Sequence, residues 1–500
     1  MEWTKLVPDS ELLGQPTAVA GGVSHDSRVV EPGGVFVAVP GLQTDGHDHI
    51  AAALAAGAAL VVVQRDREAL WRPFAAATPL LVVADSRAAL GPLAAAVYGE
   101  PSRRLRLVGV TGTDGKTTTS HLIGHVLDTL GYGCGYLSSA GFDLGGGFEA
   151  NASHMTTLEA SSIQARLAAA LAAGRQSVVV EASSEGLAQG RLRGCELDVA
   201  VFTNLTRDHL DFHGTMNAYL AAKGLLFEML DAPTAKRFPR AAVLNADDAA
   251  SVYLKERSRA PALTYALDGD ADLRVEDIAA EEGGLAFSVR FGGEVAAARL
   301  PLVGRFNVAN GLAAVGVALS QGVALADAAA ALASFPGVPG RLESIDCGQP
   351  FRVVVDIAST PAALESVLGA LRPLTAGRLS VVFGAAGGRD AARRFGLGEI
   401  AGRLADRAVV TNEDPRDEDQ TTIFAAIEAG LAATGRQRGV DYYVEAERKE
   451  AIRRAFQEAR PGDTVLLAGK ATETTMVFAG GEARPWDERA VARALLYEVL

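Results

Sequence analysis

Cysteine is scarce in this sequence: Cys134, Cys195 and Cys347 are the only three in 500 residues, and they lie far apart. This spacing excludes a cysteine-based metal motif and a disulfide framework, and it is typical of buried thiols in a reducing compartment. The first residues, MEWTKLVPDSELLG, also lack an apolar core of signal-peptide length. The expected location is therefore the cytoplasm.

An excess of basic residues and long apolar runs are missing as well. Lys and Arg number 47 against 60 Asp and Glu, which gives a net charge of −13. Such a chain has no basic surplus to neutralise nucleic-acid phosphates or an anionic membrane, although a nucleotide in a local pocket is compatible with it. Alanine-rich segments such as AAALAAGAALVVV contain glycine and are followed by charges, so none spans a bilayer. We expect small-molecule partners, no nucleic acid, no membrane and a monomer.

Short β-branched runs alternate with helical stretches rich in Ala and Leu along most of the chain. This alternation predicts an α/β fold with parallel sheets. Two breaks rich in Gly, Pro and charge, GEPSRR and FPGVPGR, interrupt the pattern. They predict three domains, over residues 1–102, 103–336 and 337–500.

The apolar runs predict strands in all three domains. These strands are expected at 35–41, 59–64, 79–85, 104–112, 177–183, 198–204, 241–247, 351–358, 379–387, 408–416 and 464–470. Helices are expected at 50–58, 86–98, 307–320 and 324–334, and a strand-rich flap at 262–300. Each of the last four strands is expected to precede a helix and ends in a polar or Gly-rich loop. Open α/β sheets bind ligands at the carboxyl ends of their strands, so these loops are candidate sites.

Residues 108–119, VGVTGTDGKTTT, connect a predicted strand to a predicted helix and indicate a phosphate-binding loop. Its glycines allow backbone N–H groups to point at phosphate oxygens, and the helix N-terminus adds its dipole. Lys116 is expected to reach the β- and γ-phosphates, and the Thr117 hydroxyl to bind Mg²⁺. The whole predicted loop comprises Gly112, Thr113, Asp114, Gly115, Lys116, Thr117 and Thr118. The strict pattern has Gly where this chain has Val110, so a plain Gly-rich turn is the alternative.

Glu181 and His209 lie at or just past the ends of two predicted strands. A carboxylate and an imidazole at neighbouring strand ends can share a metal ion with ATP phosphates. Alternatively, each residue only forms hydrogen bonds within its loop.

Lys223 occupies an unusual place in the predicted helix TMNAYLAAKGLLFEML. It falls on the same face as Tyr219, Leu226, Phe227 and Leu230. A lysine on an apolar face usually extends to solvent, but burial would lower the pKa of its amine. A neutral lysine amine can add CO₂ and become a carbamate, which is an anionic oxygen ligand for Mg²⁺.

The motifs VTGTDGKTTT, EASSEGLAQGR, TNLTRDHLDFHGTMNAYLAAK, LVGRFNVAN and VPGRLE, in this order, closely resemble those of the Mur ligases. They are most similar to the MurE type, the UDP-N-acetylmuramoyl-tripeptide synthetases. The resemblance extends from DSR at 26–28 to AGKATE at 468–473. It implies an N-terminal α/β domain for the uridine nucleotide, a central P-loop ATPase-like parallel sheet, and a C-terminal Rossmann-like domain that brings the amino acid.

The resemblance also implies ATP-dependent amide formation with Mg²⁺, in peptidoglycan precursor synthesis. The γ-phosphoryl group of ATP would pass to a carboxylate of a UDP-N-acetylmuramoyl dipeptide, giving an acyl phosphate. The amine of a diamino acid would then displace phosphate through a tetrahedral intermediate. No covalent enzyme intermediate is implied, which fits a P-loop that carries metal ions and cations.

Matching motif positions give further expected roles. Lys116 and Thr117 would serve the phosphates and Mg²⁺, Glu181 and His209 match metal ligands, and Lys223 matches a carbamylated lysine. The positions that match substrate and nucleotide contacts are Thr156, Thr157, Ser183, Gln189 and Arg191 for the muramyl peptide; Ser27 for the uridine nucleotide; Asn307, Arg341 and Asp356 for ATP; and Arg394, Arg416, Gly469 and Glu473 for the diamino acid, with Glu413, Asp414 and Pro415 in the same loop as Arg416.

The chain departs from the family motifs in the loops that face ATP and the amino acid. It has Asp114 for the usual Asn and Glu185 for the His of SSHGL. DIASTP replaces D-Y-A-H-T-P, GKATE replaces G-K-G-H-E, and EDPR replaces D-N-P-R. The resemblance therefore indicates the chemistry more firmly than the identity of the amino acid.

The residues around Arg416 leave the amino acid open. Arg416 can hold a carboxylate bidentately, as meso-diaminopimelate would require. Glu413 and Asp414 add negative charge beside it, which favours a terminal ammonium such as that of L-lysine or L-ornithine.

Two other functions are compatible with part of the sequence. One is a Mur-like ligase for a different acid, which the match of Ser27 and of the muramyl-peptide positions disfavours. The other is a nucleotide-binding protein without ligase activity, which intact Lys116, Glu181, His209 and Lys223 disfavour.

Overall fold

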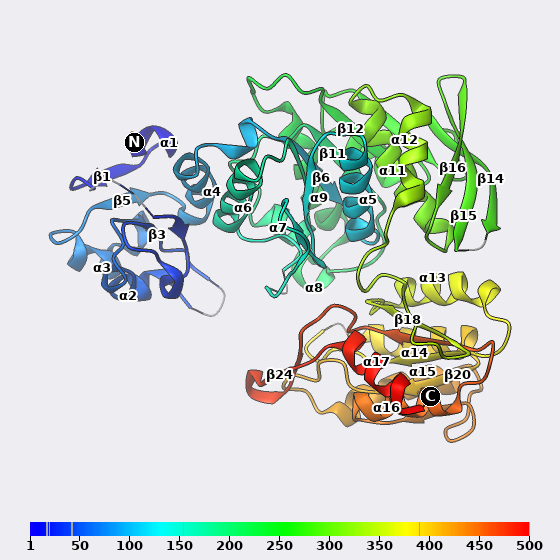
Figure 1. The fold of residues 1–500 in the computed structure, drawn as a ribbon. Coiled ribbons are helices and arrows are strands. Elements are labelled where there is room, and N and C mark those ends of the chain that lie inside the picture. Colours follow the sequence, from blue (N-terminus) through cyan, green and yellow to red (C-terminus); the bar gives the residue numbers. More distant parts are fainter. Residues whose placement is uncertain are drawn as a thin grey trace.

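The structure is a computed structural model that describes residues 1–16, 19, 21–41, 44–153, 155–281, 283–389 and 391–499. Three large sheets, each with its own helices, follow one another along the chain (Figure 1). Most neighbouring strands are parallel, so the α/β fold predicted from the sequence is confirmed. Residues 102/103 and 336/337 remain our proposed domain boundaries.

The first sheet has the strand order β1-β5-β4-β3-β2, and only β1 is antiparallel to its neighbour. Apolar clusters cover both of its faces, which explains why its strands are almost continuously apolar. Its elements are α1 (Trp3–Leu6), β1 (Glu11–Leu13), β2 (Val23–Ser24), η1 (Ser27–Val29), β3 (Val35–Val37), η2 (Gly46–His49), α2 (Ile50–Ala55), β4 (Leu60–Gln64), η3 (Arg65–Arg67), α3 (Glu68–Trp71), η4 (Arg72–Phe74), β5 (Leu80–Val83), α4 (Ser86–Val97) and η5 (Pro101–Arg103).

The central sheet has the order β16-β15-β14-β13-β12-β11-β6-β10-β7-β8-β9. Its middle is parallel, and both ends carry antiparallel additions, β14–β16 and β8–β9. Its elements are β6 (Arg106–Thr111), α5 (Lys116–Thr129), β7 (Cys134–Leu137), β8 (Gly141–Asp143), β9 (Glu149–Ala150), α6 (Ala160–Ala172), β10 (Ser177–Glu181), α7 (Ser184–Ala188), β11 (Val199–Phe202), α8 (Leu210–His213), α9 (Met216–Glu228), η6 (Met229–Asp231), β12 (Ala241–Asn245), α10 (Ala250–Lys255), β13 (Ala262–Ala266), β14 (Leu273–Glu281), β15 (Gly284–Phe291), β16 (Glu294–Leu300), α11 (Arg305–Ser320), α12 (Leu325–Ala331) and η7 (Leu332–Ser334).

The third sheet has the order β17-β18-β22-β19-β20-β21, with only β17 antiparallel to its neighbour. One prediction is wrong here: β22 leads into the hairpin β23–β24 before the last helix, whereas the other three predicted strands each precede a helix directly. Its elements are β17 (Glu343–Ile345), β18 (Arg352–Asp356), α13 (Pro361–Leu371), η8 (Arg372–Leu374), β19 (Leu379–Phe383), α14 (Ala392–Leu404), β20 (Arg407–Val410), α15 (Gln420–Ala433), β21 (Tyr442–Val444), α16 (Arg448–Glu458), β22 (Thr464–Ala468), β23 (Thr475–Val477), η9 (Ala479–Gly481), β24 (Ala483–Pro485) and α17 (Glu488–Val499).

The register of three central strands determines where the candidate site lies. Glu181 at the end of β10 is paired with Val110 of β6, and Phe202 at the end of β11 is paired with Thr111. The three strands are parallel and end at the same level. The loops that follow them therefore share one edge of the sheet.

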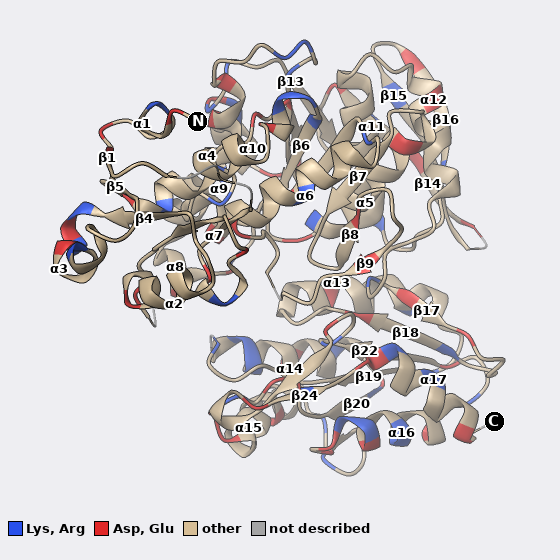
Figure 2. Cartoon of the chain, turned by 60° about the vertical axis from the view of Figure 1, so that its left-hand side comes forward, with Lys and Arg blue, Asp and Glu red and all other residues tan. Residues whose placement is uncertain are grey.

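Charged residues of both signs are interspersed over the chain (Figure 2). Within the described residues, no helix has both the length and the apolar character needed to cross a membrane.

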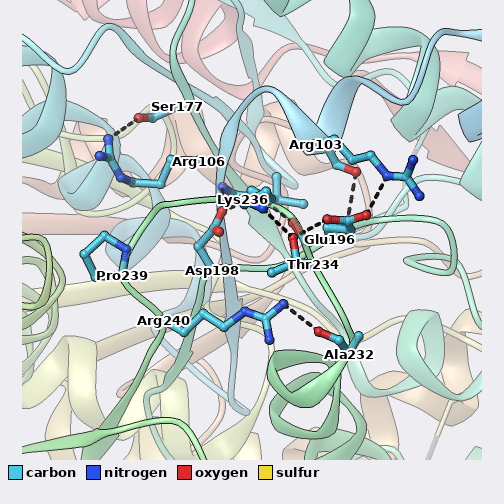
Figure 3. Close-up of polar contacts among 12 residues, drawn as sticks. Arg103, Arg106, Ser177, Glu196, Asp198, Ala232, Thr234, Lys236, Pro239 and Arg240 are labelled. Atoms are coloured by element: carbon cyan, nitrogen blue, oxygen red, sulfur yellow. Dashed lines mark hydrogen bonds and ion pairs between the residues drawn. The ribbon is translucent and has the colours of Figure 1, made fainter.

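A buried ion pair anchors the other edge of the central sheet (Figure 3). Asp198 Oδ2 accepts the Leu107 N–H at 2.7 Å and pairs with Lys236 Nζ, which also donates to the Glu196 carbonyl at 2.8 Å. The side chains of Lys236 and Asp198 are 2% and 0% exposed. The Glu196 carboxylate in turn pairs with Arg103 at 2.6 Å, in the connection from the first sheet. This network therefore ties the inter-sheet connection to the central strands.

Lys236→Met should destabilise the protein markedly, because it leaves the Asp198 carboxylate buried without its cation. We expect a loss of about 3 to 5 kcal/mol of unfolding free energy, measured by urea titration. Arg274→Ala is the control, since its pair with Asp270 is 47% and 93% exposed and should contribute about 0 to 1 kcal/mol. Equal losses of unfolding free energy in the two variants would contradict the view that the buried Lys236–Asp198 pair stabilises the protein.

Candidate functional site

The loop between β6 and α5 has the geometry of a phosphate cradle. Helix α5 begins at Lys116, so the free N–H groups of its first turn face the loop. Gly112 and Gly115 have φ angles of +152° and +82°. A Cβ at these positions would lie 1.8 Å from Thr203 Oγ1 and 2.6 Å from Asn310 Oδ1, so neither accepts a side chain. Val110, the departure from the strict pattern, lies inside β6 and is fully buried, away from the cradle.

Lys116 folds back over this loop. Its Nζ donates to the Thr113 carbonyl at 2.7 Å and to the Gly112 carbonyl at 3.2 Å. The Asp114 N–H donates to Asn204 Oδ1 at 2.9 Å, which fixes the loop to the segment after β11. Burial raises the pKa of Asp114, and the nearby Lys116 opposes that shift. Thr118 is buried in the first turn of α5.

Glu181 and Thr117 belong to one hydrogen-bonded group. The Glu181 carboxylate is fully buried, and its Oε1 accepts the Ser139 N–H at 3.0 Å. Ser139 Oγ lies 2.9 Å from Thr117 Oγ1, and Arg341 Nη2 donates to Thr117 Oγ1 at 3.0 Å. Burial raises the pKa of Glu181, while Lys116 is the strongest opposing influence.

Lys223 is buried rather than extended to solvent. It is 1% exposed, and its Nζ donates to the Gly112 carbonyl at 2.7 Å and lies 4.1 Å from the centre of the Tyr219 ring. Burial, reinforced by Lys116, lowers the pKa of Lys223 well below its ordinary value. The Tyr219 hydroxyl and Thr113 Oγ1 are 3.0 Å apart, so helix α9 is also attached to the phosphate loop.

His209 lies just before α8, with a left-handed φ of +52°. Its Nε2 is 3.4 Å from Asp208 Oδ2, and burial lowers its pKa. A neutral imidazole is the form that binds a metal ion.

Residues 113–118, Ser139, Glu181 and His209 line a cavity of about 1090 Å³ between the central and third sheets. Asn307, Arg341 and Asp356 line it as well. Asp356 accepts the Leu342 and Ala358 N–H groups, both at 2.8 Å, and burial raises its pKa. The structure therefore brings the residues expected to hold ATP together with Glu181 and His209, except that Gly112 does not line the cavity. Lys223, which donates to the Gly112 carbonyl, does not line it either.

Most residues expected to hold the muramyl peptide form a second network behind Glu181. Thr157 Oγ1 donates to the Glu181 carbonyl at 2.8 Å and lies 3.1 Å from Ser183 Oγ. Arg191 donates to the Thr157 carbonyl at 2.7 Å and to Gln189 Oε1. Thr156 lines the cavity. Ser27, at the start of η1, belongs to the first sheet region.

The residues expected to hold the amino acid form the far end of the cavity. Arg394, Glu413, Asp414, Arg416 and Glu473 all line it. Gly469 lies beneath them with a φ of +104°, and a Cβ there would be 2.9 Å from Glu413 Oε2. Pro415 connects Asp414 to Arg416, which has a left-handed φ of +53°.

The sequence predicts that Glu413 and Asp414 both add negative charge beside Arg416, but the two carboxylates differ in their partners. Asp414 Oδ1 accepts from Lys470 Nζ at 2.8 Å, so its charge is neutralised by a fully buried lysine. Arg394 is paired bidentately with Glu418, at 2.6 and 2.7 Å. Glu413 Oε2, by contrast, has no hydrogen-bond partner within the described residues. Burial and the neighbouring Glu473 raise the pKa of Glu413 to about 7.

Sequence reasoning missed several residues of the site. Ser139 lies in the ordinary-looking segment SSAG, and Lys470 lies in the GKATE motif but was given no role. Both acquire their importance through contacts with distant residues. Tyr219 was assigned only to an apolar face, although its hydroxyl reaches the phosphate loop. No spacing in the sequence could have identified these contacts.

Three family models match successive parts of the chain. The model for the Mur ligase family catalytic domain matches residues 20–98, that for the Mur ligase middle domain residues 110–318, and that for the Mur ligase glutamate ligase domain residues 340–471.

Curated relatives and a solved structure match almost end to end. A UDP-N-acetylmuramyl-tripeptide synthetase from Roseiflexus sp. (strain RS-1) is 46% identical, over 96% of this chain and 94% of that protein. A UDP-N-acetylmuramoyl-L-alanyl-D-glutamate–2,6-diaminopimelate ligase from Geobacillus thermodenitrificans is 42% identical, over 97% and 96%. A solved structure of a ligase with the latter name covers 100% of this chain and 99% of its own, with 31% identity and a TM-score of 0.65.

Lys116→Ala should weaken binding of a nucleoside triphosphate without unfolding the protein, because Lys116 is the first residue of α5 and its side chain contacts only two loop carbonyls through hydrogen bonds. We expect affinity for the non-hydrolysable analogue AMP-PNP to fall roughly 10- to 100-fold, the range for one charge-assisted hydrogen bond. Calorimetric titration measures this change, with the exposed Lys255→Ala as control. A variant that keeps normal melting and normal affinity would rule out the phosphate-loop assignment.

Proposed function

Because the chain belongs to the Mur ligase family, we propose that it adds a diamino acid to UDP-N-acetylmuramoyl-L-alanyl-D-glutamate in peptidoglycan precursor synthesis. One observation carries the proposal: a single cavity is lined by the phosphate loop, by the buried Glu181 and by the charged loop 413–416. ATP, an acceptor carboxylate and an incoming amine can therefore meet in one space, as amide formation through an acyl phosphate requires.

The residues of the site would act mainly by stabilising the negative charge of the nucleotide phosphates and by holding the substrate. Lys116, after release from the loop carbonyls, stabilises the β- and γ-phosphates, and the N-terminus of α5 adds N–H donors. Arg341 lies close enough to Thr117 to stabilise negative charge that develops during phosphoryl transfer. Thr157, Ser183, Gln189 and Arg191 would hold the muramyl peptide behind Glu181, with Ser27 holding the uridine nucleotide.

The oxygen donors in the cavity suit Mg²⁺. Thr117 and Glu181 supply a hydroxyl and a carboxylate, and His209 is held neutral nearby. The described residues contain no group of three His, Cys, Asp or Glu that could bind a metal alone, so nucleotide phosphates would have to complete the coordination. Bound Mg²⁺ would neutralise phosphate charge.

Two diamino-acid classes each have a supporting observation. The unpartnered Glu413 oxygen favours a distal ammonium. Lys470 pairs with both Asp414 and Glu473, so Arg448 is the cation that acts most strongly on Glu413. L-Lysine or L-ornithine would fit that charge. Arg416 lines the same cavity and enters no ion pair within the described part of the chain, which favours the second carboxylate of meso-diaminopimelate.

An acceptor-dependent phosphate-release assay tests the function directly. ATP, Mg²⁺ and UDP-N-acetylmuramoyl-L-alanyl-D-glutamate are combined with L-lysine, L-ornithine or meso-diaminopimelate in turn. Phosphate release that depends on one of these amino acids is the expected result. Phosphate release that requires a different acid in place of the muramoyl dipeptide would support the Mur-like ligase for a different acid. No release with any acceptor would support the nucleotide-binding protein without ligase activity.

Glu413→Gln should shift selectivity towards meso-diaminopimelate, because it removes a carboxylate beside the distal group. We expect the ratio of kcat/KM values, lysine over diaminopimelate, to fall about fivefold, or ~1 kcal/mol. In the wild type the same ratio should fall as the pH drops from 8 to 6, since a carboxyl with a pKa of about 7 loses its charge there. The variant should show no such pH dependence, whereas the exposed Glu482→Gln should behave like the wild type. An unchanged ratio would mean that Glu413 does not face the distal group.

Lys223→Ala should reduce turnover by at least about 100-fold, because we propose that Lys223 is carbamylated and supplies an anionic oxygen for Mg²⁺. Short-chain carboxylates such as acetate should partly restore the activity by filling the vacant anion position. Lys223→Arg should stay inactive, since arginine remains a cation and forms no carbamate. An active Lys223→Arg enzyme would instead show that the residue only supports the Gly112 carbonyl.

A further inference from the structure

Ser139 connects the two residues that would bring protein oxygens to Mg²⁺. It lies in the turn between β7 and β8 and lines the cavity. Its Oγ donates to Glu181 Oε1 and Oε2 at 3.2 and 3.3 Å, and its N–H donates to Oε1 at 3.0 Å. Thr117 Oγ1 is 2.9 Å from the same hydroxyl. Ser139 therefore joins two residues that are 64 positions apart in the chain, one in the first turn of α5 and one at the end of β10.

The available protons determine the direction of these hydrogen bonds. A guanidinium can only donate, so Thr117 Oγ1 accepts from Arg341. The single Thr117 proton must then point to the other side, towards Ser139 and the Glu181 carboxylate. The single Ser139 proton in turn goes to Glu181, which only accepts when ionised. The hydroxyl protons thus run from Thr117 through Ser139 to Glu181, and Thr117 Oγ1 keeps one lone pair for a cation besides the one that accepts from Arg341.

This direction of the hydroxyl protons is the one that a hydroxyl needs when it binds a metal ion. A hydroxyl binds Mg²⁺ through a lone pair and must send its proton elsewhere. Without the Ser139 hydroxyl, Thr117 would lose an acceptor and Glu181 would lose one of its donors. The Thr117 proton would then be free to rotate towards the cation.

We propose that Ser139 is a positioning residue for Mg²⁺ binding: it orients the Thr117 hydroxyl and the Glu181 carboxylate together towards the cation. This inference rests on the proposed function, because it assumes a nucleotide-bound divalent cation at the phosphate loop. Ser139 itself need not touch the metal or the phosphates.

The preceding residue provides a matched control. Ser138 is fully buried in the same turn, and its Oγ lies 2.9 Å from His121 Nε2 and donates to the Gly141 carbonyl at 2.8 Å. These contacts close the turn without reaching Glu181 or Thr117. Loss of the Ser138 hydroxyl therefore reports on the turn and on its contact with His121 of α5, while the Ser139 hydrogen bonds stay intact.

The test measures metal binding without turnover. Mn²⁺, which is visible by electron paramagnetic resonance, is titrated into the full-length protein saturated with AMP-PNP. We expect Ser139→Ala to weaken Mn²⁺ binding about 10- to 100-fold, the range for groups that orient a metal ligand. Ser139→Thr, which keeps a hydroxyl, should remain within about threefold of the wild type, and Ser138→Ala should bind Mn²⁺ normally. AMP-PNP affinity in EDTA, measured calorimetrically, should be the same in all four proteins.

The outcomes distinguish failure of the Ser139 inference from failure of the proposed function. Wild-type Mn²⁺ affinity in Ser139→Ala would overturn the inference, as would an equal loss in Ser139→Thr or in Ser138→Ala. A loss of AMP-PNP affinity in EDTA that matches the loss of Mn²⁺ affinity would also overturn it, because the serine would then only support the loop. Failure of the wild type to bind Mn²⁺ with AMP-PNP would overturn the proposed function as well.

Discussion

The parallel pairing of β6 with β10 and β11 is the constraint on which the candidate site depends. It places the phosphate loop, Glu181 and the segment that leads to His209 at one level of the sheet, although they are distant in sequence. A slip of one residue in β10 would turn the Glu181 side chain to the opposite face of the sheet. Every residue of β6 and β10 is buried, so a slip would also force side chains of different size into close-packed positions on both faces.

Burial also explains the unusual ionisation in the site. Glu181, Asp356 and Glu413 are carboxyls whose pKa is raised by desolvation, and Lys223 is a lysine whose pKa is lowered by it. Nearby cations offset part of the shift for the three carboxyls: Lys116 and Arg341 for Glu181, Arg341 for Asp356, and Arg448 and Lys470 for Glu413. For Lys223 the neighbouring Lys116 is a like charge that adds to the effect of burial. Added phosphates, metal and amino acid would change this balance. The protein is thus organised around charges that its ligands would help to compensate.

Contiguous sequence motifs predicted much of the fold and of the candidate site. The α/β order depends on local patterns that the structure confirms, and the predicted phosphate loop connects a strand to a helix as expected. The pattern left open whether Lys223 extends to solvent or is buried, and in the structure it is buried. Glu181 was identified because a charged residue at the end of an apolar strand is conspicuous. Contacts between distant segments were not predicted. Lys470 neutralises Asp414 from 56 residues away, and Lys236 pairs with Asp198, which precedes it in the chain by β11, α8, α9 and η6. The hairpin after β22 was also missed, because β23 and β24 are short and partly exposed.

Glu181 presents two different groups to two different neighbours. Its carboxylate faces the phosphate-loop side, through Ser139 and Thr117, while its own carbonyl oxygen accepts a hydrogen bond from Thr157 at 2.8 Å. In the proposed function, one amino-acid residue thereby connects the side that would hold the nucleotide to the side that would hold the acceptor. Alignment of these two sides is built into the central sheet, whereas loop 413–416 belongs to a separate sheet. Errors in placing the amine would consequently slow only the second half of the reaction, after the acceptor has been activated.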